Sequence, residues 1–130
     1  MSNKFLLKYV FVCDDVRKED NGKLIVLGVY TSDILVRSFP VNLELALLLA
    51  FHTDFEGSLP FDLKVEFEGR LIVSGAGKMN TAQMGDGIVP LPKVRLVGIE
   101  KAGHLSFSIK FEGEEWQVAK TIAIVQSDSI

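Results

Sequence analysis

The 130-residue chain has one cysteine, Cys13, and no long apolar run. A single thiol cannot form an internal disulfide, so a reducing compartment, the cytoplasm, is expected. The longest uninterrupted apolar run, Leu45–Phe51, is far shorter than the roughly 20 residues that a membrane helix requires. Lys8 also interrupts the N-terminal apolar stretch that would have to serve as an export signal. These features predict a cytoplasmic protein that does not bind membranes.

The sequence also has few residues suited to catalysis or to nucleic-acid binding. Its 14 Lys and Arg residues are outnumbered by 17 Asp and Glu, and the basic residues are scattered, so a nucleic-acid partner is not expected. His52 and His104 lie in no catalytic motif, and Cys13 would meet either of them only by an accident of folding. One cysteine and two distant histidines are also a poor zinc site. We therefore predict no enzymatic activity, no metal and no cofactor.

A β-hairpin is predicted between Tyr9 and Tyr30, where two apolar runs flank a charged segment. The Asn21-Gly22 pair tolerates positive φ, which the tight turn of a hairpin needs. The residues Val10–Val16 and Leu24–Tyr30 can then pair antiparallel. The other strands are expected to add to this pair.

Alternation of apolar and polar residues predicts most of the other strands, most clearly in Phe61–Glu68. The segment Asn42–His52 is apolar on both faces, which favours a central strand, although its Leu-Ala composition would also suit a helix. Pro40 follows Ile34–Val36, which therefore belongs at a sheet edge. The expected strands are Phe5–Cys13, Lys23–Tyr30, Ile34–Val36, Asn42–His52, Phe61–Glu68, Leu71–Ser74, Lys93–Ile99, His104–Phe111 and Trp116–Val125.

The spacing of these strands predicts the fold class. Turn signals recur about every 8–12 residues and no helical period persists, a pattern typical of sandwiches and barrels. Several strands have one polar face, as expected when each of two sheets buries one side. We predict a single all-β domain over residues 1–130, an antiparallel two-sheet β-sandwich of about eight strands, immunoglobulin-like or C2-like.

The first candidate site is the segment Gly75–Pro92, predicted to be a long irregular loop. Loops of this length in compact domains are commonly functional or disordered. Its glycine amides and polar side chains could hold a phosphate-bearing ligand, and its methionines could make adaptable apolar contacts. The candidate binding residues are Lys78, Asn80, Thr81, Met84 and Asp86. The alternative is a mobile linker.

The second candidate site is the charged part of the hairpin, with Asp14, Asp15 and Arg17. A two-residue turn would place Asp15 opposite Gly28 and would bring Asp14 among valines. Because an unpaired carboxylate is costly there, either a bulge turns Asp14 outward or the strand ends at Cys13. The acids would then stabilise turn amides, and the alternative is that they hold calcium or the basic group of a partner.

The stretch CDDVRKEDNGKLIVLGVY, from Cys13 to Tyr30, together with the late segment VAKTIAIV, resembles a family of small bacterial and phage proteins of unknown function. The resemblance implies a β-sandwich and no established activity. We therefore expect a non-enzymatic binding or interaction module that takes a protein partner or a small ligand and that could self-associate as a homo-oligomer. The alternative is a protein that sequesters a nucleotide-like, phosphate-containing molecule under the Gly75–Pro92 loop, in a phage or defence role.

Overall fold

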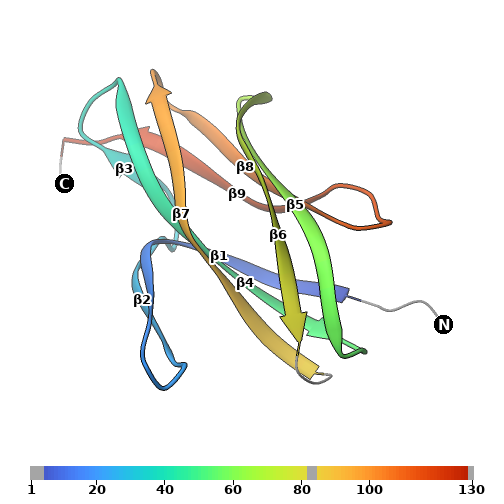
Figure 1. The fold of residues 1–130 in the computed structure, drawn as a ribbon. Helices are drawn as coiled ribbons and strands as arrows, with labels where there is room; N and C mark the ends of the chain where they lie inside the picture. Colours follow the sequence, from blue (N-terminus) through green and yellow to red (C-terminus); the bar gives the residue numbers. More distant parts are fainter. Residues whose placement is uncertain (1–4, 82–84, 129–130) are drawn as a thin grey trace.

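The computed structural model describes residues 5–81 and 85–128, and this part of the chain forms nine strands and no helix (Figure 1). The prediction of an all-β chain is confirmed. The strands are β1 Phe5–Lys18, β2 Leu24–Val29, β3 Ile34–Val36, β4 Val41–Thr53, β5 Gly57–Phe67, β6 Arg70–Thr81, β7 Gly85–Ile99, β8 Gly103–Phe111 and β9 Gln117–Gln126.

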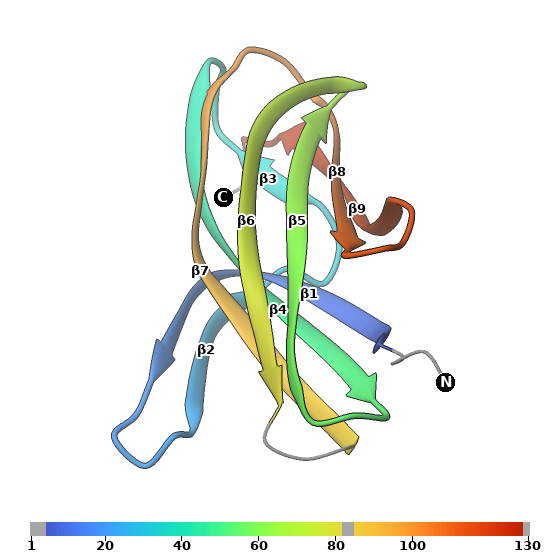
Figure 2. The same ribbon diagram turned by 45° about the vertical axis from the view of Figure 1, so that its right-hand side comes forward.

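The strands form two sheets. Sheet A has the order β2-β1-β4-β7, and sheet B has the order β3-β9-β8-β5-β6. The short edge strand β3 pairs in parallel with β9, so the expectation of a wholly antiparallel arrangement is wrong at this edge. Sheet B curls into a half-barrel, whose long strands β5 and β6 are bent (Figure 2).

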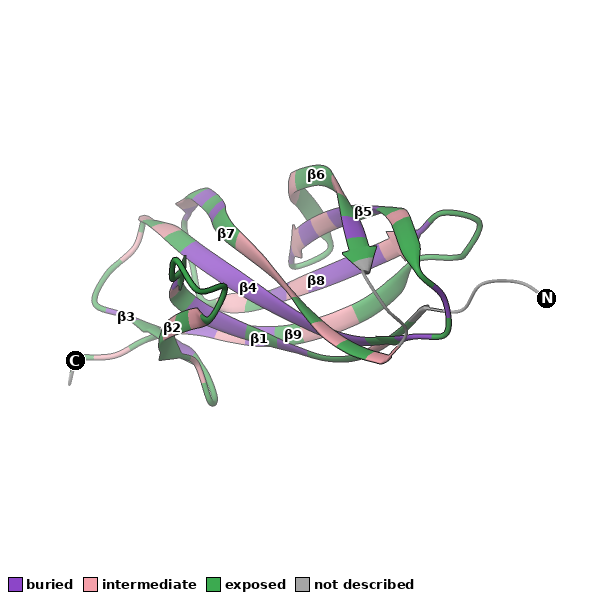
Figure 3. Cartoon of the chain, turned by 60° about the horizontal axis from the view of Figure 1, so that its bottom comes forward, coloured by how far each residue is buried: buried purple, intermediate pink, exposed green. Residues whose placement is uncertain are grey.

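The main core lies between the sheets and confirms the alternation expected for β4. Leu45, Leu47, Leu49 and Phe51 all point into it. The opposite face of β4 contributes Ala46 and Leu48 to a second, smaller apolar cluster. Burial on both faces explains why β4 is apolar throughout, and Figure 3 shows it as the longest buried stretch of sheet A. A helix would not separate these residues into two clusters by odd and even number.

The strands β5 and β8 also follow their predicted faces. Phe61, Val65, Phe67 and Phe107 are buried, as the alternating pattern requires. The turn after β5 uses two residues with positive φ, Glu68 at 50° and Gly69 at 79°. This is the mirror-image turn that suits the twist of paired strands.

The predicted loop Gly75–Pro92 is wrong, because most of this segment belongs to β6 and β7. Two of its four glycines, Gly77 and Gly87, lie where aromatic rings cover the backbone. A Cβ atom on Gly77 would lie 2.7 Å from Phe61 Cζ, and one on Gly87 would lie 2.5 Å from Phe51 Cζ. The strands therefore need glycine at these positions, although glycine in a sequence usually suggests a loop.

The turn of the hairpin also differs from the expected two-residue form. The Gly22 amide donates to the Glu19 carbonyl at 3.0 Å, and the Glu19 amide donates to the Lys23 carbonyl at 2.8 Å. The loop is thus three residues long, with Gly22 at φ 87°. This extra residue shifts the register by one, so that Asp15 lies opposite Leu27 rather than Gly28.

Candidate functional site

The face of sheet A that points away from the main core is apolar in its middle. Register places one residue each of β1, β4 and β7 side by side, in two neighbouring rows. The rows are Phe11–Leu48–Pro90 and Tyr9–Ala50–Ile88. Sheet B covers the other face of these strands, so these rows belong to the outer face.

The β1–β2 hairpin covers only part of this outer face. Val16, Leu24 and Val26 of the hairpin pack with Ala46 and Leu48 of β4 in the smaller apolar cluster. Beyond this contact the hairpin diverges from the ends of β4 and β7 (Figure 2). A groove of about 750 Å³ lies between the hairpin and these ends of β4 and β7. It is lined by Lys8, Tyr9, Gly22, Lys23, Leu24, Val26, Leu48, Ala50, Phe51, Asp86, Gly87 and Ile88.

Large apolar side chains on this face are exposed to solvent. Tyr9 is 49% exposed and Ile88 is 51% exposed, and both line the groove. Tyr9 also packs edge-on against Phe11, with ring centroids 5.0 Å apart, which holds its ring in place. The groove therefore presents a fixed apolar surface rather than scattered apolar residues.

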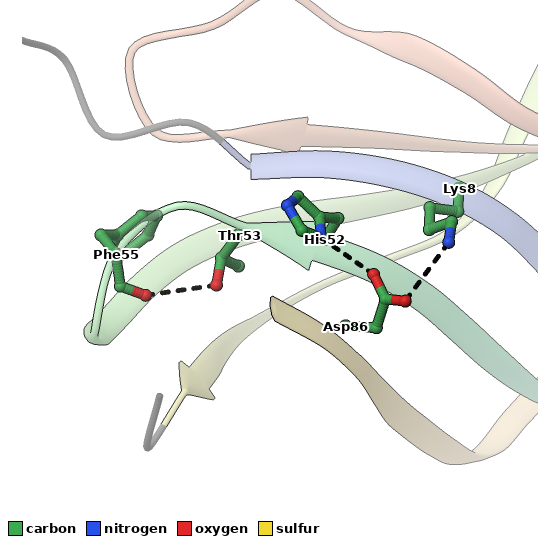
Figure 4. A network of polar contacts seen from close by, with 5 residues as sticks. All are labelled: Lys8, His52, Thr53, Phe55 and Asp86. Atoms are coloured by element: carbon green, nitrogen blue, oxygen red, sulfur yellow. Dashed lines mark hydrogen bonds and ion pairs between the residues drawn. The ribbon is translucent and has the colours of Figure 1, made fainter. Parts of the chain in front are cut away.

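A polar cluster of Lys8, His52 and Asp86 lies next to the Tyr9–Ala50–Ile88 row in the register of sheet A. Figure 4 shows the contacts among its three side chains. Asp86 of β7 accepts a hydrogen bond from His52 Nδ1 of β4, at 2.9 Å, and lies 3.5 Å from Lys8 Nζ of β1. The hydrogen bond from His52, followed by the charge of Lys8, holds the pKa of Asp86 below its usual value. The three side chains link all three strands of the groove floor and mark its polar end.

Lys23, at the end of the hairpin loop, lines the groove from the other wall. Its side chain is exposed, and no ion pair joins it to another residue in ranges 5–81 and 85–128. Since Lys8 is paired with Asp86, Lys23 is the cation available to a ligand.

Asp14 is exposed rather than packed among the valines of β1. The strand continues past it to Lys18 without a register shift in its pairing with β2, so the alternative that the strand ends at Cys13 is wrong. Asp14 Oδ1 accepts a hydrogen bond from the Tyr30 hydroxyl at 2.7 Å. Burial, helped by this hydrogen bond, raises the pKa of Tyr30 well above its ordinary value. Asp14 lies against Gly28, which has φ 67° and no room for a side chain. The contacts of Asp14 with Tyr30 and Gly28 stabilise the base of the hairpin.

Asp15 and Arg17 interact with their own strand. Asp15 Oδ1 accepts a hydrogen bond from the Val16 amide at 2.9 Å, and its Oδ2 lies 3.0 Å from Arg17 Nε. These contacts are local and fit the structural interpretation of the charged hairpin.

The candidate binding residues from the predicted loop Gly75–Pro92 lie in different places. Lys78 and Asn80 are exposed on β6 in sheet B, and Thr81 is the last residue of that strand. Asp86 lies on β7 in sheet A and lines the groove. Met84 falls outside the described residues. The structure thus separates the expected set between two sheets.

Sequence reasoning missed Tyr9, Lys23 and Ile88 as groove residues. The available signal was β4, which is apolar on both faces and therefore needs a cover on each side. The sequence does not show which part of the outer face of sheet A the hairpin leaves uncovered. The residues at that place could therefore not be named in advance.

Cys13 of β1 is fully buried in the smaller apolar cluster, where its thiol lies 3.5 Å from the Ala46 carbonyl. Burial, and then the charge of Asp14, raises the pKa of this thiol. Both effects should suppress its reactivity.

We therefore expect Cys13 to react with dithiobisnitrobenzoate at least about a hundredfold more slowly in the folded protein than in urea, because reaction requires local opening that costs several kcal/mol. The rate is followed by absorbance at neutral pH. Equal rates in the two states would show that the smaller apolar cluster does not shield Cys13 from solvent.

Within ranges 5–81 and 85–128, no three His, Cys, Asp or Glu side chains gather in a way that could hold a metal ion. None of the described residues form a helix long and apolar enough to cross a membrane.

Comparison with known proteins gives a family and no activity. No curated protein matches the chain. The model of a family of unknown function, DUF6941, matches residues 8–123, a span that includes both walls of the groove. The chain therefore belongs to the DUF6941 family of unknown function.

Proposed function

We propose that this protein is a non-enzymatic binding module whose groove takes a ligand with an apolar body and one acidic group. The observation that carries the proposal is the incomplete cover on the outer face of sheet A. The hairpin buries Leu48 and Ala46, yet leaves Tyr9 and Ile88 half exposed beside them. Exposed apolar surface of this kind, gathered in one concave place, is typical of binding sites.

The size and lining of the groove support a small ligand. Its volume of about 750 Å³ lies within the roughly 300–1,000 Å³ typical of small-molecule sites. Most of its lining side chains are apolar, and the few charged ones, Lys8, Lys23 and Asp86, would fix the orientation of a ligand.

The charges of the lining support an acidic group on the ligand. Two lysines and one aspartate line the groove, which leaves one positive charge in excess. Asp86 is held by Lys8 and His52, whereas Lys23 faces the groove without an ionic partner among the described residues. An acidic group beside Lys23 would gain a charge-assisted contact.

The proposal is tested with anilinonaphthalenesulfonate, a fluorescent probe that has an aromatic body and one sulfonate. We expect the folded protein to bind it and Ile88→Asp to weaken binding at least about tenfold, because the new charge would lose hydration under the probe. Val97→Asp is the matched control, since Val97 is exposed on the same strand and does not line the groove. Equal binding by both variants would refute the groove as the site.

A neutral probe separates the apolar and the acidic parts of the proposal. Lys23→Gln should weaken anilinonaphthalenesulfonate and leave Nile red, which carries no charge, unchanged. If both probes weaken equally, Lys23 does not select an acidic group and that part of the proposal fails.

A further inference from the structure

We propose that the outer face of sheet B carries a second binding site, which takes one neutral sugar ring beside Trp116. This sheet B site is separate from the groove on sheet A and does not depend on the ligand proposed above. It is a hollow of about 400 Å³, within the roughly 300–1,000 Å³ typical of small-molecule sites. The residues that define it are Asp62, Lys64, Leu71, Ser74, Ala76 and Trp116.

The floor and one wall of the sheet B site follow from the register of β5 and β6. On β5, Asp62 and Lys64 flank the buried Leu63, so both charged side chains point away from the core. The neighbouring edge strand β6 places Ala76 opposite Asp62 and Ser74 opposite Lys64. Because both of these β6 side chains are small, they leave room above the floor.

Trp116 forms the opposite wall. It belongs to the connection between β8 and β9, yet its ring lies against Lys64 of β5, whose Nζ is 4.4 Å from the ring centroid. The ring therefore reaches back across β8, the strand between β9 and β5. Ser108 of β8 lies beside Lys64 in the register and is only 3% exposed, as expected under such a cover. Trp116 itself is 40% exposed, so it offers a fixed aromatic surface to a ligand.

The charges of the lining favour a neutral ligand. Asp62 and Lys64 carry one charge of each sign, so the sheet B site has no net attraction for an ion. Lys64 is further balanced by Glu66, whose Oε1 lies 3.7 Å from its Nζ. Asp62 forms no ion pair with any residue in ranges 5–81 and 85–128, although Lys110 lies opposite it on β8. The Asp62 carboxylate can therefore accept hydrogen bonds from a ligand.

A sugar ring matches this combination of groups. Its hydroxyls both donate and accept, so they suit an acceptor at Asp62 and donors at Lys64 and Ser74. Asp62 and Lys64 are two residues apart along the strand, roughly 7 Å, which is comparable to the width of one ring with its hydroxyls. The C–H groups of the same ring would pack on Trp116. A purely apolar ligand would instead remove water from both charges without replacing its hydrogen bonds.

The fluorescence of Trp116 tests the proposal, because Trp116 is the only tryptophan of the chain. The full chain is titrated with glucose, galactose, mannose, N-acetylglucosamine, maltose and lactose. We expect at least one of these neutral sugars to change the emission saturably, with a dissociation constant on the order of 1 mM, because the site is small and open. If no sugar of this panel gives a saturable change, the proposal is overturned.

Asp62→Asn should weaken the binding of that sugar at least about tenfold, because the charged acceptor is lost. Asp20→Asn is the matched control, since Asp20 is exposed at the tip of the hairpin and does not line the sheet B site. Equal binding by these two variants would show that Asp62 does not hold the sugar and would overturn the site.

Ala76→Leu blocks the sheet B site without changing its charge. Ala76 is exposed on the outward side of β6, so leucine should be tolerated there and should weaken the sugar at least about tenfold. Ala102→Leu, at an exposed position between β7 and β8, is the matched control and should bind as the unaltered chain does. Melting curves show that each variant folds. A saturable response to adenosine and to no sugar overturns the sugar assignment, and so does a sugar response that is equal in the two leucine variants.

Discussion

Truncation of Phe107 to alanine should lower the free energy of unfolding by about 3–5 kcal/mol, the usual range for a large aromatic removed from a core. Phe107 is fully buried on β8, opposite Val65 of β5, in the middle of sheet B. The surrounding strands are tied into the sheet on both sides, so they cannot collapse into the cavity that the ring would leave.

Ser106→Ala is the matched control, since Ser106 is the preceding residue and points to the other face of β8. It should change stability by less than about 0.5 kcal/mol. The measurement is urea unfolding followed by fluorescence and circular dichroism. If the two variants shift the midpoint by the same amount, the assignment of inner and outer faces to β8 is wrong.

The faces of the strands could be predicted because the sequence alternates wherever one side meets water. In β5, Phe61, Leu63 and Val65 point inward and the residues between them are polar, so the strand and its orientation followed directly. β4 was more ambiguous, since it lacks a polar face. Its assignment rested on the argument that an apolar strand is covered on both sides, which the two apolar clusters confirm.

The second half of β6 and the first half of β7 were missed because glycine has two opposite uses. In a loop it allows unusual φ angles, but in Gly77 and Gly87 it makes room for the rings of Phe61 and Phe51 on neighbouring strands. The sequence alone does not reveal which ring lies over which glycine. The same limit applies to the groove, since Tyr9 and Ile88 become neighbours only through Ala50, the β4 residue between them.

The hairpin turn was misjudged by one residue, and this small difference changed the interpretation of the acids. A three-residue loop places Gly28 beside Asp14, and the left-handed backbone of Gly28 gives the Asp14 carboxylate room to reach Tyr30. The Asp14 carboxylate, which was expected among valines, thus stabilises the base of the hairpin through its hydrogen bond with Tyr30. The hairpin in turn forms one wall of the proposed groove.

Substitution of Gly28 by alanine should therefore destabilise the protein by about 2–4 kcal/mol. Part of this cost, about 1–2 kcal/mol, is the strain of a left-handed conformation in a residue with a side chain. The remainder arises because a Cβ atom at Gly28 would clash with the Asp14 carboxylate and break its hydrogen bond with the Tyr30 hydroxyl. The measurement is the free energy of unfolding from urea titrations.

Two further variants separate these contributions. Gly22→Ala should cost only about 1–2 kcal/mol, because Gly22 has a similar φ and no atom within 4 Å of its missing Cβ. In an Asp14→Ala background, Gly28→Ala should likewise cost about 1–2 kcal/mol, since the carboxylate that it displaces is already gone. The difference in the cost of Gly28→Ala between the two backgrounds measures how much the Asp14 carboxylate stabilises the contact between β1 and β2. If Gly28→Ala costs the same with and without Asp14, the carboxylate does not hold the hairpin, and the wall of the groove is positioned by the apolar cluster around Val16 and Val26 alone.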